Sequence, residues 1–266
     1  MSKNVLEMID IQKSYGPIPA IEQASFELKK GSVVALVGAN GAGKSTLMNI
    51  LGGVTKANKG RIIVNGSEVY FNSPSDAALQ GIQFVHQELS VFKTMTVAEN
   101  IFINRFPSKL SIIKKAEIVR TSRQLLKELG SELDPGISVE SLSTGDCQMV
   151  VIARAMLGAP EILILDEPTS SLSQYEKEKL NKVIKRLKNK GVSIIYITHF
   201  ISEIFDICDC VTIMRNGSTI TSTSIEETNS TRIIELMLGE VVASGRGTKR
   251  DLTDTLFLSV EDLNKN

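Results

Sequence analysis

Several residue types are scarce in this sequence, and each scarcity excludes a class of function. The chain has no Trp, nine Phe and four Tyr, so it offers no evident aromatic platform on which single-stranded nucleic acid could stack. Its three cysteines lack C-x-x-C spacing, and only two histidines are available to complete a metal site. We therefore expect reduced, buried thiols in a cytosolic protein and no metal centre built on them.

Net charge and long apolar runs are also missing. Thirty Lys and Arg balance thirty Asp and Glu, so no overall field attracts nucleic acid, and we expect no nucleic-acid partner. The longest apolar runs, which include Val33–Val37 and Ile162–Leu165, have strand length, whereas a membrane-spanning helix needs ~20 residues. The first ten residues include Glu7 and Asp10 and no apolar leader region, so we expect neither export nor a membrane span.

Strand patterns alternate with helical ones along the chain. Its 266 residues allow one large domain or two lobes, since a typical domain has ~150 residues. Val33–Val37, Ile162–Leu165 and Ile194–Thr198 have the continuous apolar character of strands buried on both faces. Asn-Gly pairs at 65–66 and 216–217 predict two hairpins. This alternation predicts an α/β fold.

Helical spacing dominates two later stretches. From about residue 88 to 160 strand runs disappear, and Glu117–Leu129 and Asp146–Leu157 have helical patterns, so we expect a mostly helical insert. Further on, apolar residues at i, i+3, i+4 and i+7 predict an amphipathic surface helix with a solvated lysine-rich face; they are Leu180, Val183, Ile184 and Leu187.

A glycine-rich motif follows the first buried strand and opens a helix. It fits G-x-x-x-x-G-K-[ST] and consists of Gly38, Ala39, Asn40, Gly41, Ala42, Gly43, Lys44 and Ser45. Glycines let successive N–H groups point inward at phosphate oxygens, and the helix N-terminus adds a favourable dipole. Lys44 supplies an ammonium and Ser45 a hydroxyl suited to Mg²⁺. This strand, loop and helix predict a phosphate-binding loop.

Two adjacent acids end the second buried strand. Asp166 and Glu167 would repel each other and be desolvated there without a cation, which argues against a merely structural pair. Asp166 is therefore the candidate ligand of Mg²⁺. Glu167 is the candidate general base for an attacking water, a role typically worth ~10²–10⁴ in rate.

Five further positions are ambiguous when each is taken alone. Ser143 and Gly145 precede a helix and form either an ordinary N-cap or a second phosphate clamp. His199 ends an apolar strand and could be a core-edge histidine. Tyr15 could be a turn aromatic, and Gln87 a polar loop residue.

These motifs together, in this order and approximate spacing over residues 5–240, resemble the ATP-binding-cassette (ABC) ATPases. The resemblance implies a P-loop NTPase core with a mixed sheet, an N-terminal antiparallel β subdomain and a helical subdomain insert. It also implies Mg²⁺ held by Ser45, Gln87 and Asp166, and catalysis by Glu167 with His199 as γ-phosphate switch. The positions it assigns to ATP binding are Tyr15, Gly38, Ala39, Asn40, Gly41, Ala42, Gly43, Lys44, Ser45, Thr46 and Gln87.

The same resemblance implies that ATP lies between two cassettes. Ser143 and Gly145 of one cassette would then reach the γ-phosphate held by the other, and an isolated chain would bind ATP but turn it over slowly. Three positions depart from the common pattern: Thr144 replaces glycine, Asp146 replaces glutamine, and Ser173 replaces aspartate. The extra carboxylate of Asp146 would be unfavourable beside a γ-phosphate unless it points away or interacts with a cation, and Ser173 alters a position linked to communication across a dimer.

Finer details are similar to the first half of the two-cassette ATPases of bacterial simple-sugar importers of the ribose/galactose type. Among these details are His86-Gln87-Glu88-Leu89 and Ala98-Glu99-Asn100-Ile101-Phe102. Residues 258–265 echo residues 6–13, so the resemblance implies a nucleotide-binding domain over 1–240, a linker over 241–255 and the start of a second cassette over 256–266. The core would be 1–87 and 161–240, and the helical subdomain 88–160.

We therefore expect an ATP-hydrolysing subunit at the cytoplasmic face of the membrane that powers import of a sugar or related solute. Its expected partners are a second cassette, in the same polypeptide or in a homodimer, a membrane permease and, indirectly, a solute-binding protein. Two alternatives stay open: a cassette protein acting on ribosomes or DNA, and a regulatory ATP-binding module with little turnover.

Overall fold

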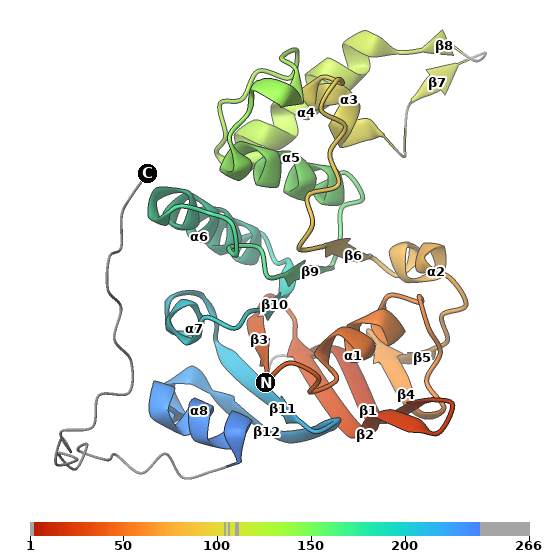
Figure 1. Ribbon diagram of the computed structural model, residues 1–266. Helices are drawn as coiled ribbons and strands as arrows, with labels where there is room; N and C mark the ends of the chain where they lie inside the picture. The colour runs from red at the N-terminus through yellow and green to blue at the C-terminus, as the bar shows by residue number, and fades with distance from the viewer. Residues whose placement is uncertain (1–2, 104, 106, 110–111, 240–266) are drawn as a thin grey trace, which may run out of the picture.

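The computed structural model describes residues 3–103, 105, 107–109 and 112–239, and a mixed β-sheet forms its centre (Figure 1). Within these residues ten strands pair in the order β5-β4-β1-β2-β12-β11-β3-β10-β9-β6. The strands are β1 (Asn4–Tyr15), β2 (Ile18–Lys29), β3 (Val33–Val37), β4 (Lys59–Val64), β5 (Ser67–Val69), β6 (Ile82–Val85), β9 (Ile162–Asp166), β10 (Ser193–Ile197), β11 (Cys210–Arg215) and β12 (Ser218–Ser224).

The sheet has an antiparallel part and a parallel part. Strands β5, β4, β1 and β2 pair antiparallel, whereas β11, β3, β10, β9 and β6 run parallel. Strand β12 joins the two parts because it pairs antiparallel with β11 and parallel with β2. The expected mixed sheet with an N-terminal antiparallel subdomain is confirmed. Both Asn-Gly hairpins are also present, with positive φ at Asn65, Gly66, Asn216 and Gly217.

Helices cover both faces of this sheet (Figure 1). They are α1 (Lys44–Leu51), α2 (Pro74–Leu79), α3 (Val97–Phe102), α4 (Lys115–Leu129), α5 (Thr144–Met156), α6 (Gln174–Asn189), α7 (Ile201–Ile207) and α8 (Ser230–Leu238). The residues predicted to form the apolar stripe of the amphipathic helix are those that α6 buries. Among the helices of the described residues, none combines the length and the hydropathy needed to span a bilayer.

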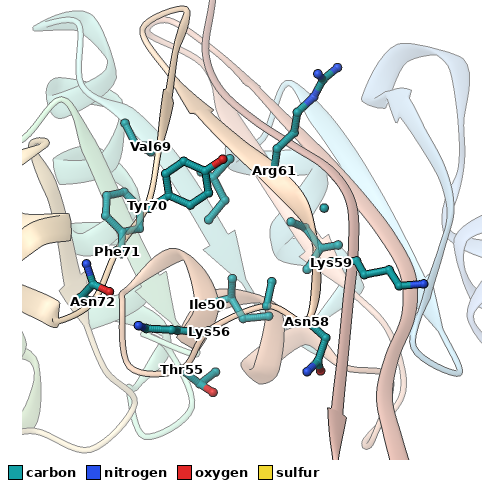
Figure 2. Close-up of a pocket in the computed structure, with 14 residues that line it drawn as sticks. Ile50, Thr55, Lys56, Asn58, Lys59, Arg61, Val69, Tyr70, Phe71 and Asn72 are labelled. Carbon is teal, nitrogen blue, oxygen red and sulfur yellow. The ribbon is translucent and has the colours of Figure 1, made fainter.

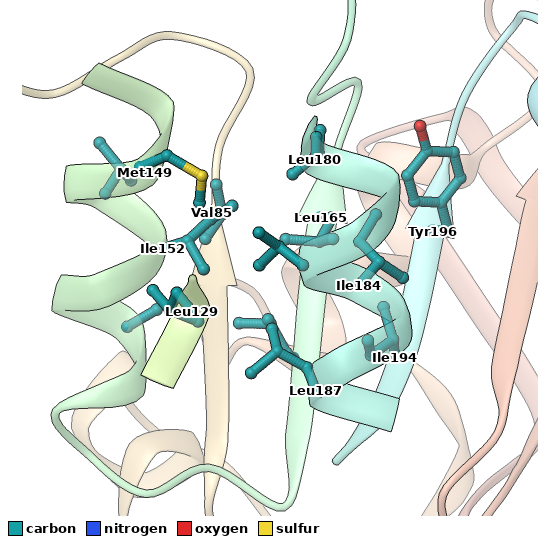
Figure 3. Packing of buried hydrophobic residues seen from close by; sticks show 14 of the residues in the cluster. Val85, Leu129, Met149, Ile152, Leu165, Leu180, Ile184, Leu187, Ile194 and Tyr196 are labelled. Atoms are coloured by element: carbon teal, nitrogen blue, oxygen red, sulfur yellow. The ribbon is translucent and has the colours of Figure 1, made fainter. Parts of the chain in front are cut away.

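Two apolar cores lie on opposite faces of the parallel strands. Successive side chains of a strand point to opposite faces, so Val33, Ala35 and Val37 of β3 join one core, and Val34 and Leu36 join the other. The first core is covered by α5 and α6, whose apolar side chains meet those of the sheet (Figure 3). The second core is covered by α1 and the antiparallel strands. Burial on both faces accounts for the continuous apolar runs.

Residues 88–160 contain α3, α4, α5 and a 3₁₀ turn at Val139–Ser141. The described part of this segment is mostly helical, as expected, and it also contains one short antiparallel pair of strands that was not predicted, β7 (Ser108–Lys109) with β8 (Ile112–Ile113). Helix α5 also begins before the expected Asp146, because the Ser143 side chain accepts the Asp146 N–H as an N-cap. The predicted domain limits stay predictions, and the expected linker and second-cassette start lie outside the described residues.

Candidate functional site

The candidate site lies where four adjacent parallel strands end. Strand β3 leads into the phosphate loop, β10 leads to His199, β9 ends at Asp166, and β6 leads to Gln87. The register places Asp166 level with Ile197 of β10. Parallel strands present their carboxyl ends at one edge of a sheet, where open α/β folds bind their ligands. The sheet therefore gathers at one edge residues that are far apart in sequence.

The phosphate loop is held by close backbone packing. Gly43 adopts φ +98° and caps α1, and a Cβ at this position would lie 2.9 Å from the Ala20 carbonyl oxygen. A Cβ at Gly38 would collide with the Met214 carbonyl oxygen of β11. The turn between β11 and β12 braces the loop from the same side, since the Gly217 N–H donates to the Ala42 carbonyl at 3.2 Å. Only glycine fits at both close approaches.

The Lys44 ammonium folds back over the loop. It donates to the Gly38 carbonyl at 2.8 Å and to the Ala39 carbonyl at 3.1 Å. Burial lowers the pKa of Lys44, and the Glu167 and Asp166 carboxylates partly offset that effect. The ammonium thus faces both the loop and the acids of β9, the position from which it could meet a phosphate group. Ser45 and Thr46 follow in the first turn of α1.

The acid pair after β9 sits in an unfavourable electrostatic setting. Burial raises the pKa of Asp166 and the neighbouring Glu167 raises it further, while His86 and Lys44 act in the opposite direction. Glu167 adopts a left-handed φ of +44°, a conformation that costs energy for a residue with a side chain. Its N–H donates to the Ile197 carbonyl of β10 at 2.9 Å, which fixes the backbone there.

Glu167 and His199 are brought into direct contact. The Glu167 Oε1 atom lies 3.2 Å from His199 Nδ1, with the side chains 23% and 52% exposed. Both groups are therefore accessible to a ligand at the sheet edge while they remain paired to each other. Glu167 and His199 belong to separate sequence motifs, and the parallel pairing of β9 with β10 brings them together.

Tyr15 and Gln87 are exposed at the periphery. Tyr15 ends β1 with 51% of its surface exposed, and the Lys13 ammonium lies 5.0 Å from its ring centroid. Gln87 follows β6 on the exposed surface. Both side chains are free to meet a ligand, and their assignment to adenine and to Mg²⁺ stays a prediction.

The candidate clamp at the start of α5 contacts α6. The Gly145 N–H donates to Glu176 Oε1 at 2.9 Å, and the Ser143 hydroxyl donates to Asp146 Oδ2 at 3.1 Å. Asp146 Oδ1 lies 3.9 Å from the Lys179 ammonium, so the extra carboxylate has a cation nearby. Ser143 and Gly145 thus have internal partners away from the chain's own phosphate loop. Their role as a clamp stays a prediction.

Three acidic or basic residues near these motifs were not selected by the sequence reasoning. His86 lies close enough to Asp166 to lower its pKa. Glu176 caps α6 and binds the Gly145 N–H. Glu203 is buried and accepts four hydrogen bonds. A signal for Glu203 is present in the sequence, since it is an acid four residues after His199 beside the buried apolar Ile204.

A separate cavity of about 290 Å³ lies beside the β4–β5 hairpin (Figure 2). Tyr70, Phe71 and Lys56 line it, and Figure 2 shows the side chains of Lys59 and Arg61 extending away from the others. None of the residues predicted to bind nucleotide lines this cavity. It is therefore not part of the candidate site.

Comparisons with known proteins show what the chain is similar to. The ABC transporter family model matches residues 21–170. The chain is 44% identical over 235 residues to the ribose import ATP-binding protein RbsA of Bacillus subtilis (strain 168), covering 88% of this chain and 48% of that protein. It is 43% identical over 241 residues to the xylose import ATP-binding protein XylG of Thermoanaerobacter pseudethanolicus, covering 90% of this chain and 48% of that protein.

A solved structure shows the same fold. It is the ADP conformation of an ATP-binding cassette of an ABC transporter, with a TM-score of 0.80 and 28% identity over 90% of this chain and 100% of that one. The chain spans about half the length of the curated relatives it matches, 48% in both cases above.

Proposed function

The chain belongs to the ABC transporter family, and from this premise we propose that it is an ATP-hydrolysing cassette that powers import of a sugar or related solute through a separate permease. The observation that carries the proposal is the sheet edge that joins the phosphate loop to the paired Glu167 and His199. The relatives named for ribose and xylose import support a sugar as the class of solute.

Hydrolysis requires a water oxygen to form a bond to the γ-phosphorus while the bond to the bridging oxygen breaks and ADP leaves. Glu167 is placed to orient this water and to accept its proton. His199, in contact with Glu167, would meet the γ-phosphate, and the Lys44 ammonium would stabilise charge on the phosphate oxygens. Each role uses a group at the same sheet edge.

The oxygen donors of this edge fit a Mg²⁺ ion. Ser45, Gln87 and Asp166 offer a hydroxyl, an amide oxygen and a carboxylate, which are the hard ligands that this cation prefers. The raised pKa of Asp166 shows that its surroundings compensate its charge poorly, which favours a cation there. When bound, Mg²⁺ would neutralise charge on the phosphate groups.

A second cassette would complete the site. Ser143 and Gly145 contact residues of their own chain on the α6 side, so a clamp on the γ-phosphate would come from another cassette. The chain spans about half of its relatives, which is consistent with a second cassette in the same polypeptide. The echo of residues 6–13 in residues 258–265 supports this chain as the N-terminal one. A homodimer is the other arrangement.

A groove beside α3 and α5 supports the permease as partner. It encloses about 440 Å³, and its lining includes His86, Arg105 and Arg154. Apolar surface is left uncovered nearby, with Val54 in the lining 63% exposed and Leu79 on α2 84% exposed. We place the permease contact here, at the cytoplasmic face of the membrane. A solute-binding protein would act only through the permease.

Phosphate release by the purified chain tests the proposal. Glu167→Gln should abolish turnover and keep nucleotide binding, whereas Glu161→Gln, at the amino end of β9, should change neither. Turnover should rise with protein concentration because the clamp comes from a second cassette. A rate that is independent of concentration and unchanged in Glu167→Gln would contradict the mechanism. Recovery of nucleic acid instead of a permease in a pull-down would favour a ribosomal or DNA function.

A further inference from the structure

A buried carboxylate lies behind the candidate catalytic pair. Glu203 of α7 is only 7% exposed, and its Oε2 atom accepts hydrogen bonds from the hydroxyls of Thr169 at 2.8 Å, Tyr196 at 2.8 Å and Thr198 at 3.1 Å. Its Oε1 atom accepts from the Lys177 ammonium of α6 at 3.1 Å. A carboxylate this deep in a protein is costly unless it is paired and hydrogen-bonded, and here both oxygens are.

Two of these partners belong to the segments that carry Glu167 and His199. Thr169 lies two residues after Glu167 in the loop that follows β9. Thr198 directly precedes His199, and its hydroxyl also accepts the Phe200 N–H at 3.0 Å. One carboxylate oxygen therefore holds the loop of the proposed general base and the loop of the proposed switch residue.

The Lys177 ammonium, which is the cation of this network, also contacts the segment that carries His199. The Lys177 ammonium lies 4.4 Å from the centroid of the Phe200 ring, immediately after His199, while it binds Glu203. Phe200 in turn packs against the His199 ring, with 4.0 Å between centroids. Both neighbours of His199 in the chain are thus fixed by the Glu203 and Lys177 pair, whereas the imidazole itself stays exposed.

We propose that Glu203 is a positioning residue that sets the contact between Glu167 and His199 and so controls the rate of ATP hydrolysis without taking part in ATP binding. The inference rests on the proposed function. Small displacements of reacting groups can cost ~10²-fold in rate. The phosphate loop connects β3 to α1, and among the hydrogen bonds of the described residues none joins it to this network.

Glu203→Gln is the informative variant because it keeps the shape of the side chain. If the amide oxygen faces the three hydroxyls, the amide N–H₂ faces the Lys177 ammonium, and two donors oppose each other. The reverse orientation removes the acceptor shared by Thr169 and Thr198. Lys177→Met is the companion variant, since it leaves the three hydroxyl bonds in place and removes only the cation, so it separates the contributions of the two.

Asp209→Asn is the matched control. Asp209 also joins a strand to α6, because it accepts the Val33 N–H at 2.9 Å and binds the Lys188 ammonium at 2.6 Å. Val33 begins β3, so this pair lies at the amino ends of the strands, away from the candidate site. The Asp209→Asn variant therefore measures the effect of removing a structural carboxylate without disturbing the loops that carry Glu167 and His199.

The experiment combines ATP turnover, ATP affinity and the NMR signals of the imidazole protons in the nucleotide-free chain. Only two histidines are present, so His86 serves as the reference for His199. We expect Glu203→Gln to lower kcat by about 10- to 100-fold, to leave Kd for ATP within about twofold, and to shift the His199 signals, whereas Asp209→Asn changes none of these.

The readouts separate failure of this inference from failure of the proposed function. Unchanged kcat or unchanged His199 signals in Glu203→Gln would overturn the positioning role. A parallel loss of kcat and ATP affinity would also overturn it, because it would indicate general damage to the fold. If the native chain proved to be no ATPase, the proposed function would fail, and the positioning of His199 by Glu203 would still be decided by the NMR signals.

Discussion

Removal of the Glu176 carboxylate should destabilise the junction between α5 and α6. Glu176 accepts the Gly145 N–H at 2.9 Å, the Ser173 N–H at 3.0 Å and the Ser173 hydroxyl at 2.8 Å. The same carboxylate therefore completes the capping box of α6 and holds the first turn of α5. Glu176→Ala leaves the Ser173 cap itself in place but removes all three of these bonds.

The expected loss of stability in Glu176→Ala follows from these hydrogen bonds. A hydrogen bond to a charged group contributes about 1.5–3 kcal/mol when it is well buried, and an acid at a helix N-terminus adds about 0.3–1 kcal/mol. The Glu176 side chain is partly exposed, so solvent screens part of this sum. We expect Glu176→Ala to lower the free energy of unfolding by about 2 kcal/mol. Glu178→Ala, an exposed acid on the same helix, should change it by less than about 0.5 kcal/mol.

The loss should also depend on pH. The hydrogen bonds from Ser173 and Gly145 lower the pKa of Glu176 from 4.5 to about 2. A depressed folded-state pKa contributes stability above the unfolded pKa, and this stability is lost as pH falls through the folded pKa. The difference between the native chain and Glu176→Ala should thus be full at neutral pH and shrink between pH 4.5 and about 2.

Urea unfolding followed by circular dichroism at pH 7 and at pH 3.5 measures both effects. A Glu176→Ala midpoint equal to that of Glu178→Ala at pH 7 would refute the contribution of the junction. A gap that stays constant or widens at pH 3.5 would refute the assignment of that contribution to the ionised carboxylate.

Three further changes test other parts of the structure. Lys44→Ala should abolish binding of a fluorescent ATP analogue without lowering the melting temperature; retained binding would contradict the loop geometry. Asp166→Asn should raise the melting temperature at pH 7, because the raised pKa means that ionised Asp166 destabilises the fold, and the gain should vanish below pH 3.8. Ile184→Ala should cost about 2–5 kcal/mol in urea unfolding, since this fully buried residue of α6 would leave a cavity; a smaller loss would indicate collapse of the site.

Local sequence patterns predicted those elements in which the pattern of burial stays the same from one end to the other. Strand β3 is buried on both faces and is followed by a glycine-rich motif, so its apolar composition and the motif both predicted a strand, a phosphate loop and a helix. The apolar stripe of α6 follows from helical periodicity alone, because one face meets the sheet and the other meets water. These predictions needed no information about distant parts of the chain.

Contacts between distant segments could not be predicted in the same way. The link between the two parts of the sheet depends on bonds such as that from the Ser25 N–H to the Thr219 hydroxyl, 194 residues apart. The Glu203 network likewise joins α6, α7 and the loops after β9 and β10, and each of its residues has an ordinary local context. Such contacts are set by strand order and register, which local propensity does not encode.

Three positions that break local rules lie together where phosphate chemistry would occur. Glu167 holds a left-handed backbone, Asp166 has a raised pKa and Lys44 a lowered one, and each of these costs stability in the absence of a ligand. The surrounding parallel strands are buried on both faces, and the apolar area that they bury can offset that cost. A ligand with phosphate groups and a cation would relieve the same charge conflicts, so binding energy and folding energy are coupled at this edge of the sheet.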